Sequence, residues 1–213
     1  MLVQRALAIG LLVLCTTAAY PDTAPSVPQE GRGAGDPGLA DLHISESDVV
    51  PREAFERYIR RVHRYIDPVY LRTVFLAYAD ATATEGVSLV VALAQMIHET
   101  DYLRFTGAVH PTQYNFSGIG STGPGIPGDR FQDVATGVLA HVQHLRAYAD
   151  SEPLVRELVD PRFFLVTRGS AKTVRALTGR WATDPLYGEK VLAHAHRLLE
   201  TARWYGKALP RTR

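Results

Sequence analysis

Apolar residues recur at helical spacing in the first half of the chain and predict three consecutive helices. The first helix is expected at about residues 51–65, with Pro51 in its first turn. Its apolar stripe would comprise Phe55, Tyr58, Ile59, Val62 and Ile66. The pair Asp67-Pro68 starts a second helix, which runs to about residue 81. Ser88 is suited to cap a third helix, which is strongly apolar and ends near Glu99.

The second half of the chain begins with an irregular segment and then returns to helical patterns. Residues 103–130 have no helical period and are crowded with glycine and proline, so we expect a loop or a short hairpin. Asp133 can cap a helix through residue 148, with Val134, Val138, Val142 and Leu145 facing inward. A short helix is expected near 172–177, and Asp184-Pro185 starts the last helix, to about residue 205. The pattern predicts a mainly α domain of roughly seven helices with few strands.

The segments that flank this domain differ from it in composition. Residues 1–19 contain a positive residue and a short apolar run, which is typical of an export signal cleaved after Ala19. Residues 20–44 are rich in Pro, Gly, Ala and Ser and predict a disordered linker. The folded domain is expected at about 45–205, followed by a basic tail at 206–213. We therefore expect a protein exported to the periplasm, the cell envelope or the extracellular space.

Cys15, the only cysteine of the chain, offers a second interpretation of the N-terminus. If it became the lipid-modified first residue, the protein would be an envelope lipoprotein. The residue before it is Leu14, where a small residue is usual, so cleavage after Ala19 is favoured. No window is long and apolar enough for an ordinary spanning helix, so we expect no integral membrane span after signal cleavage.

Charge and histidine spacing argue against several functional classes. The formal net charge of +1 gives no support for nucleic-acid binding. His98-Glu99 lacks the second histidine of a zinc protease, because position 102 is tyrosine. His141 and His144 share a helix face that we interpret as solvated rather than metal-binding. We expect no metal site and no cofactor, and the oligomeric state is left open.

Glu99 is the strongest candidate for chemistry. It ends a helix that is apolar on much of its surface, so burial opposes ionisation of its carboxyl group. The negative end of the helix dipole acts in the same direction. Both effects favour a protonated carboxylic acid near neutral pH, which is the state that a general acid requires. The structural alternative is a solvent-exposed glutamate at a helix end.

Five further residues are candidates for a sugar site. Asn115 could bond sugar hydroxyls and Phe116 could stack on a pyranose ring, although they could equally be a turn residue and a core anchor. Asp129 is a possible second carboxylate, with a plain solvated charge as its alternative. Trp181 and Tyr187 could line the cleft or only pack the core.

Four sequence blocks together resemble the glucosaminidase domain of glycoside hydrolase family 73. The blocks are ALAQMIHET (92–100), NFSGIG (115–120), RFQDVATGVLAHVQHLRAYA (130–149) and WATDPLYGEKVL (181–192). They follow the order and separation of the family over about residues 85–200, and four blocks in register are more specific than any one alone.

The resemblance implies a lysozyme-like, mainly helical fold with a small β-lobe beside the cleft. It implies hydrolysis of the β-1,4 bond after N-acetylglucosamine in the glycan strands of peptidoglycan. The family's general acid falls on Glu99, its cleft tyrosine on Tyr187 and the amide of its turn on Asn115.

This chain departs from the family's pattern in two ways. The segment between Gly120 and Phe131 is short, so the β-lobe is expected to be reduced or replaced by an irregular loop. The family's second carboxylate lies in that lobe, and Asp129 is the candidate for it. A glutamate that is common ahead of the following helix is Ala135 here. If a second carboxylate is missing, a neighbouring acetamido group of the substrate could assist.

The leading hypothesis is an exported endo-β-N-acetylglucosaminidase that acts on peptidoglycan, with Glu99 as general acid. A lytic transglycosylase on the same glycan also works with one glutamate, but it would leave anhydro-muramic ends. A non-catalytic peptidoglycan-binding envelope domain would bind sacculi and release no soluble product.

Overall fold

The structure is a computed structural model that describes residues 39–123 and 125–208. The expected export signal at 1–19, Cys15 and most of the expected linker lie outside the described residues, as does the end of the tail at 209–213. Within the part of the chain that is described, no helix combines the length and the apolar composition needed to cross a membrane.

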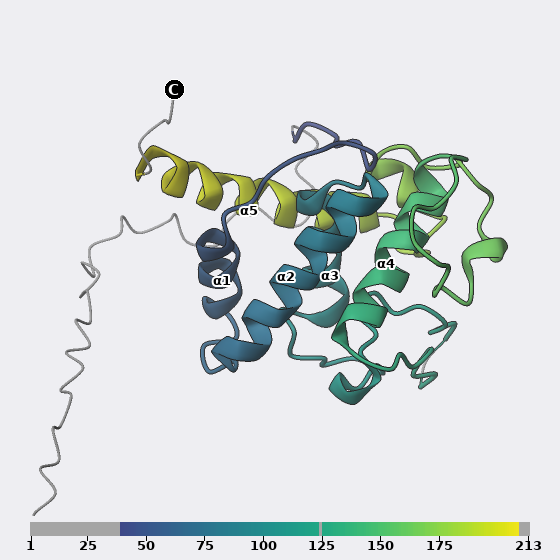
Figure 1. Ribbon diagram of the computed structural model, residues 1–213, viewed down its shortest axis with the longest axis horizontal. Coiled ribbons are helices and arrows are strands. Elements are labelled where there is room, and N and C mark those ends of the chain that lie inside the picture. Colours follow the sequence, from purple (N-terminus) through teal and green to yellow (C-terminus); the bar gives the residue numbers. More distant parts are fainter. Residues whose placement is uncertain (1–38, 124, 209–213) are drawn as a thin grey trace, which may run out of the picture. The chain divides into compact units, whose positions relative to one another are not determined.

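Helices make up nearly all of the regular structure of the described residues (Figure 1). The α-helices are α1 (Arg52–Arg60), α2 (Pro68–Glu85), α3 (Leu89–Thr100), α4 (Val134–Ala149) and α5 (Tyr187–Ala208). Short 3-10 helices are η1 (Pro111–Gln113), η2 (Phe163–Leu165) and η3 (Arg175–Leu177). Among the described residues, extended pairing is limited to two isolated β-bridges. The prediction of a mainly α, lysozyme-like domain is confirmed, and an irregular loop takes the place of a β-lobe.

Local capping signals explain where three of the helices begin. Asp67, Ser88 and Asp133 precede α2, α3 and α4, and each side chain accepts a hydrogen bond from the backbone N–H three residues on. Pro68 also occupies the first position of α2, where its missing N–H costs nothing. The three helix starts predicted from the sequence are therefore confirmed.

The ends of the helices depart further from the expectations. α1 stops at Arg60 rather than near residue 65, because the N–H groups of Val62 and His63 both fold back onto the carbonyl of Ile59. As a result Val62 is 39% exposed instead of lying on the buried stripe. α2 extends beyond residue 81 to Glu85, and Gly86, whose φ of 69° suits glycine, caps its C-terminal end.

α3 lies at the centre of the domain and is buried everywhere except at His98 and Glu99. α3 packs chiefly against α5, and α2 packs chiefly against α4. Figure 1 shows α2, α3 and α4 beside one another, with α5 crossing them and α1 against α5. This arrangement directs the C-terminal end of α3 toward the irregular loop.

Residues 39–44 belong to the folded domain rather than to the linker that was expected to reach residue 44. Ile44 is fully buried, and its N–H donates to the carbonyl of Lys172 at 2.9 Å. Its carbonyl accepts from the N–H of Ser88 at 2.7 Å, and Val174 donates to the carbonyl of Leu42 at 3.0 Å. The domain boundary therefore lies no later than residue 39, whose carbonyl accepts from Nη2 of Arg175 at 2.7 Å.

The segment between α4 and η2 has no regular structure, but buried side chains hold its backbone in place. The carboxylate of Glu85 accepts from the N–H groups of Val155 and Arg156 at 2.9 and 3.0 Å. The side-chain oxygen of Gln143 accepts from the N–H of Val159 at 2.9 Å. These bonds satisfy backbone groups that would otherwise be unpaired, and they fix a segment that continues to the candidate site.

Candidate active site

Glu99 lies in the last turn of α3, where the chain makes an abrupt change of direction. Asp101, Tyr102 and Leu103 follow with φ values of 49°, 59° and 61°, which L-residues adopt only at a cost. The hydroxyl of Thr100 stabilises the change of direction by accepting from the N–H of Leu103 at 2.9 Å. The helix therefore ends at Thr100, one residue after Glu99, and the chain turns away from the helix axis at Asp101.

Two opposing effects set the pKa of Glu99. Burial raises the pKa from 4.5 to about 7, and hydrogen bonding by Tyr187 and Trp181 lowers it again in part. The Tyr187 hydroxyl donates to Oε1 of Glu99 at 2.5 Å. A substantial fraction of Glu99 is therefore protonated near neutral pH, as the sequence argument predicted.

The hydroxyl of Tyr187 is itself held by a buried amide. Nε2 of Gln95 donates to it at 2.7 Å, and Gln95 has no exposed surface. Tyr187 is only 2% exposed. This tyrosine therefore contacts the acid directly, while its ring stays in the core.

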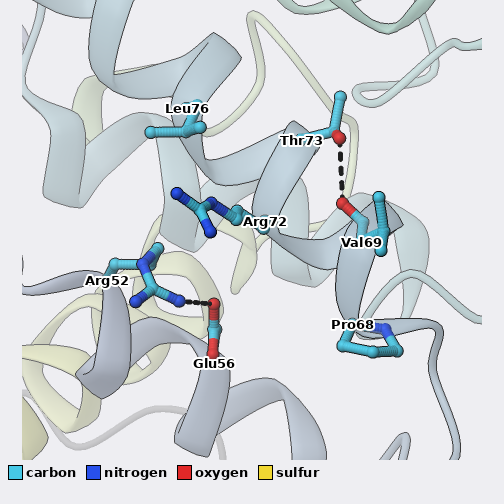
Figure 2. A pocket seen from close by; sticks show the side chains of 7 residues that line it. All are labelled: Arg52, Glu56, Pro68, Val69, Arg72, Thr73 and Leu76. Carbon is cyan, nitrogen blue, oxygen red and sulfur yellow. Dashed lines mark hydrogen bonds and ion pairs between the residues drawn. The ribbon is translucent and has the colours of Figure 1, made fainter. Parts of the chain in front are cut away.

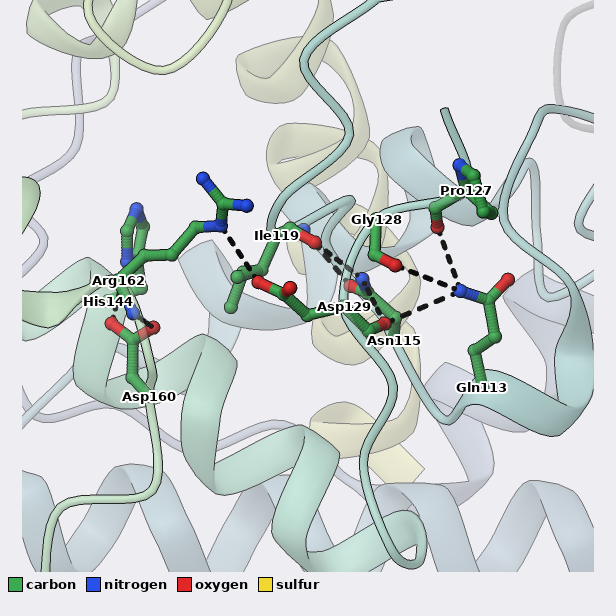
Figure 3. Close-up of polar contacts among 9 residues, drawn as sticks. All are labelled: Gln113, Asn115, Ile119, Pro127, Gly128, Asp129, His144, Asp160 and Arg162. Carbon is green, nitrogen blue, oxygen red and sulfur yellow. Dashed lines mark hydrogen bonds and ion pairs between the residues drawn. The ribbon is translucent and has the colours of Figure 1, made fainter. Parts of the chain in front are cut away.

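The loop that faces Glu99 is closed by its own side chains (Figure 3). Nδ2 of Asn115 donates to the carbonyls of Ile119 and Asp129 at 2.8 and 3.0 Å, and its Oδ1 accepts from the N–H of Ile119 at 3.1 Å. Nε2 of Gln113 donates to the carbonyl of Pro127 at 2.9 Å. Because these bonds join the two arms of the loop, the described residues of 113–129 form one structural unit.

Gly118 brings this loop against the acid. It has a φ of 69°, and a Cβ at this position would lie 3.6 Å from Oε2 of Glu99. Oε1 of Glu99 meets Tyr187, whereas Oε2 lies beside Gly118. The two oxygens of the carboxyl group therefore have different environments.

A cleft of about 150 Å³ lies between this loop and the C-terminal part of the domain. Its walls are formed by Ser117, Gly118, Ile119, Gly120, Ser121, Thr122, His144, Tyr148, Arg162 and Trp181. Trp181 packs edge-on against His144, with ring centres 4.9 Å apart. Glu99 is not itself one of the wall residues, but its Oε2 lies beside Gly118, which is.

The structure brings together only part of the residue set that the sequence suggested. Glu99 and Tyr187 touch, and Trp181 lines the cleft. The amide of Asn115 is buried and engaged within the loop, and Phe116 has no exposed surface. These two residues match their structural alternatives, a turn residue and a core anchor.

Asp129 has a positively charged partner. Its Oδ2 accepts from Nε of Arg162 at 2.8 Å, and both side chains are about one third exposed, at 31% and 35% (Figure 3). A Cβ on Gly120 would lie 2.6 Å from the same oxygen. Asp129 therefore ties the loop to the segment that follows α4.

His141 and His144 do not form a solvated face, so that interpretation is wrong. His141 is fully buried, and its pKa is lowered to about 3, chiefly by burial. His144 pairs with the buried Asp160, with Nδ1 and Oδ2 2.7 Å apart. His141 faces the interior because α4 packs against α2, and His144 lies at the cleft wall.

Several residues around Glu99 were not predicted from the sequence as neighbours of the site. Gln95 lies one helical turn before Glu99, and His141 lies three residues after Val138 and four before Leu145. Their helical spacing placed both on buried faces and was a usable signal. Arg162 lies in an irregular segment, where no sequence period indicates direction.

A larger hollow of about 520 Å³ lies elsewhere, between α1 and α2 (Figure 2). Arg52 and Glu56 form an ion pair at its edge, and Val69 and Leu76 contribute apolar surface. Glu56 is therefore already paired with a cation. The hollow offers no arrangement comparable to the one around Glu99.

Comparison with known proteins agrees with the geometry. A family model, Glucosaminidase, described as mannosyl-glycoprotein endo-beta-N-acetylglucosaminidase, matches residues 76–200. An uncharacterized protein of Borreliella burgdorferi is 43% identical over 148 residues, which cover 70% of this chain and 72% of that protein. The matched range includes Glu99, the loop opposite it and Tyr187. The resemblance seen in the four sequence blocks is confirmed: the chain belongs to the glucosaminidase family and is, at the level of that family, a glycoside hydrolase.

Proposed function

We propose that this protein is an exported peptidoglycan hydrolase that cleaves the β-1,4 bond after N-acetylglucosamine, with Glu99 as general acid. The observation that carries the proposal is a carboxyl group beside a cleft, with a pKa raised to about 7, inside the matched family range. A general acid is most effective when its pKa lies near the working pH.

In the proposed reaction, Glu99 donates its proton to the glycosidic oxygen, and the bond from that oxygen to the sugar carbon breaks. The acetamido oxygen of the same N-acetylglucosamine stabilises the positive charge that develops, since Asp129 is engaged with Arg162. Water then adds to the sugar carbon and returns a proton to Glu99. The rings of Trp181 and Tyr148 offer apolar surfaces for the pyranose rings.

Export is the second part of the proposal, and it rests on the composition of residues 1–19. The mass of the mature protein tests it. A chain that begins at Tyr20 would support cleavage after Ala19, and a lipid-modified Cys15 would support an envelope lipoprotein instead. An unprocessed chain that stays inside the cell would contradict export.

Mass spectrometry of the material released from purified peptidoglycan tests the reaction. We expect the full chain to release fragments with reducing N-acetylglucosamine ends. Glu99→Gln should release them about a thousandfold more slowly or not at all, because an amide cannot donate the proton. Glu200→Gln, which alters an exposed glutamate of α5, is the matched control and should keep wild-type activity.

The products also separate the alternatives. Anhydro-muramic ends would identify a lytic transglycosylase. A folded protein that pellets with sacculi and releases nothing would be a binding domain. Equal activity of Glu99→Gln and the wild type would rule out Glu99 as the acid.

A further inference from the structure

A continuous chain of buried hydrogen bonds connects Glu99 with the opposite side of the core. The hydroxyl of Tyr78 lies 2.7 Å from Nδ1 of His141, and Nε2 of His141 lies 2.8 Å from Oε1 of Gln95. Nε2 of Gln95 donates to the Tyr187 hydroxyl at 2.7 Å, and that hydroxyl donates to Glu99 at 2.5 Å. The four residues that lead to Glu99 are between 0% and 2% exposed: Tyr78, His141, Gln95 and Tyr187. Four helices, α2, α4, α3 and α5, each supply at least one of its members.

The direction of each hydrogen bond follows from its neighbour, beginning at Tyr78. Burial raises the pKa of Tyr78 well above its ordinary value, so the hydroxyl keeps its proton. Among the described residues its hydrogen-bond partner is Nδ1 of His141, to which it must donate if its buried proton is to be paired.

The hydrogen bond from Tyr78 determines which nitrogen of His141 donates to Gln95. With its pKa lowered to about 3, the imidazole is neutral and carries one proton. Because Nδ1 accepts from Tyr78, the proton is on Nε2, which donates to Oε1 of Gln95. The orientation of the Gln95 amide is thereby fixed, with its N–H₂ group toward Tyr187.

The amide then determines the role of Tyr187. Its hydroxyl oxygen accepts from Gln95, and its only proton is directed at Oε1 of Glu99. When Glu99 is protonated, Oε1 is therefore already an acceptor, and the acid proton belongs on Oε2. Oε2 is the oxygen beside Gly118, a residue of the cleft wall.

We propose that Tyr78, His141 and Gln95 are positioning residues that direct the proton of Tyr187 to Oε1 of Glu99 and thereby place the acid proton on Oε2, toward the substrate. The inference deepens the proposed function and rests on Glu99 as the acid of that function. None of the three residues touches the cleft; they act through Tyr187.

A role in packing alone would not require this arrangement. Buried polar groups contribute little net stability compared with apolar side chains of the same shape, and a partly broken network is worse than none. The five side chains instead satisfy one another in a single direction that ends on the acid. If the direction were lost, the Gln95 amide could turn over and accept the Tyr187 proton, which would leave Glu99 with Trp181 but without its Tyr187 donor.

Other titratable groups surround this network and must be distinguished from it. His98 packs against Tyr187 with ring centres 5.5 Å apart, and burial lowers the pKa of His98. Burial and then His144 lower the pKa of His141, whereas burial and then Glu99 raise that of Tyr187, with a smaller contribution from Tyr148. The charged groups nearby are Lys190 and Asp184, which act on His98 in opposite directions.

Tyr78→Phe is the main test, because it removes one hydroxyl at the end of the network farthest from Glu99. Without that donor, His141 can carry its proton on either nitrogen, and the amide of Gln95 is no longer fixed. We expect the pKa of Glu99 to rise by about half a unit or more, because its carboxylate loses a committed donor. The alkaline limb of the pH–rate profile should move upward by the same amount.

Tyr70→Phe is the matched control. It removes another buried hydroxyl from α2, one that makes no hydrogen bond within the described part of the chain. The pKa of Glu99 and the pH profile should not change in this variant, whatever happens to stability.

His141 provides a second, conservative pair of variants. His141→Leu removes the donor to Gln95, whereas His141→Gln keeps an N–H group that can reach the same oxygen. We expect His141→Leu to shift the pKa of Glu99 at least as far as Tyr78→Phe does, and His141→Gln to restore most of the wild-type value. If His141→Leu fails to fold, the two tyrosine variants still decide the question.

The readout is the titration of Glu99 by carbon-13 NMR on the full chain without substrate, with Glu99→Gln to assign the signal. Folded Tyr78→Phe with an unchanged titration of Glu99 would overturn the proposal. Because the titration needs no activity, it is separate from the glycosidase test. An inactive wild type with a shifted titration in Tyr78→Phe would support the positioning residues and contradict the proposed function.

Discussion

Two regions meet at Glu99 and use their polar side chains in opposite ways. In the first region, the helical wall that α3 and α5 form behind the acid, Gln95 donates to Tyr187 and Tyr187 donates to Glu99. On the loop wall, residues 113–129, Gln113 and Asn115 direct theirs back to the backbone of the loop. The difference indicates that the helical wall supplies the chemistry and the loop wall supplies the shape.

The carboxyl groups of Glu99 and Asp129 lie in equally different environments. Glu99 meets a neutral hydroxyl and an indole, and burial dominates its pKa. Asp129 meets the guanidinium of Arg162 in a partly exposed ion pair. A group that must deliver a proton needs the first kind of environment, and a group that fastens one segment to another needs the second.

Asn115→Ala should have the largest effect on stability, because it removes hydrogen bonds that hold the loop wall together. The change removes a buried amide and leaves the N–H groups of Ser117 and Ile119 without their acceptor. We expect a loss of about 4 kcal/mol in the free energy of unfolding, measured by urea denaturation, since each unsatisfied buried group costs about 1–3 kcal/mol. Activity should fall as well, because Gly118 would no longer be held beside Glu99.

Ser121→Ala is the control within the same loop. Its exposed hydroxyl donates to the carbonyl of Ile126, so its loss should cost less than about 0.5 kcal/mol. If Asn115→Ala kept wild-type stability and only weakened substrate binding, Asn115 would be a sugar ligand, and the division between the two walls would be wrong.

The helical wall could be predicted from the sequence more fully than the loop wall. Caps such as Ser88 and Asp133 act within one turn, so the sequence alone locates the helix starts. The same periodicity should have placed His141 inward with Val138 and Leu145, but a histidine invites a surface interpretation. Helical spacing therefore indicated the buried position of His141, whereas the residue type suggested an exposed one.

The loop wall could not be predicted in the same way, because its order depends on contacts between distant positions. Asn115 is fixed by a carbonyl 14 residues later, and Asp129 by Arg162, which is 33 residues later. Neither spacing corresponds to a helix or strand period. The sequence could show that residues 103–130 are irregular, but not which of their side chains face the cleft.

Glu99→Gln should have a smaller, pH-dependent effect on stability. The pKa of Glu99 is 4.5 in the unfolded reference and about 7 in the folded protein, so between these values the folded state keeps a proton that the unfolded state has lost. The wild type should therefore lose stability as pH rises through this window, by about 3 kcal/mol above pH 7. The amide of Glu99→Gln cannot ionise, so the variant should not lose this stability as pH rises.

Urea denaturation of both proteins at about pH 4 and pH 8 measures this difference. The variant should be the more stable protein at pH 8, and the two should be similar at pH 4, where both carry a neutral side chain. Parallel pH dependence in the two proteins would mean that burial does not raise the pKa of Glu99, and the contrast between the carboxyl groups would disappear.

Asp129→Asn should have the smallest effect of the three. The Asp129–Arg162 pair is about one third exposed on each side, so removing its charge should cost at most about 1 kcal/mol. Asp80→Asn, which removes the more exposed pair with Arg156, is the matched control.

If Asp129 only fastens the loop, hydrolysis should fall less than about tenfold, because general acid catalysis by Glu99 would be intact. A loss as large as that of Glu99→Gln, in a protein as stable as Asp80→Asn, would make Asp129 the second catalytic carboxylate. In that case the loop wall would supply chemistry as well as shape, and Arg162 would have to release Asp129 when substrate binds.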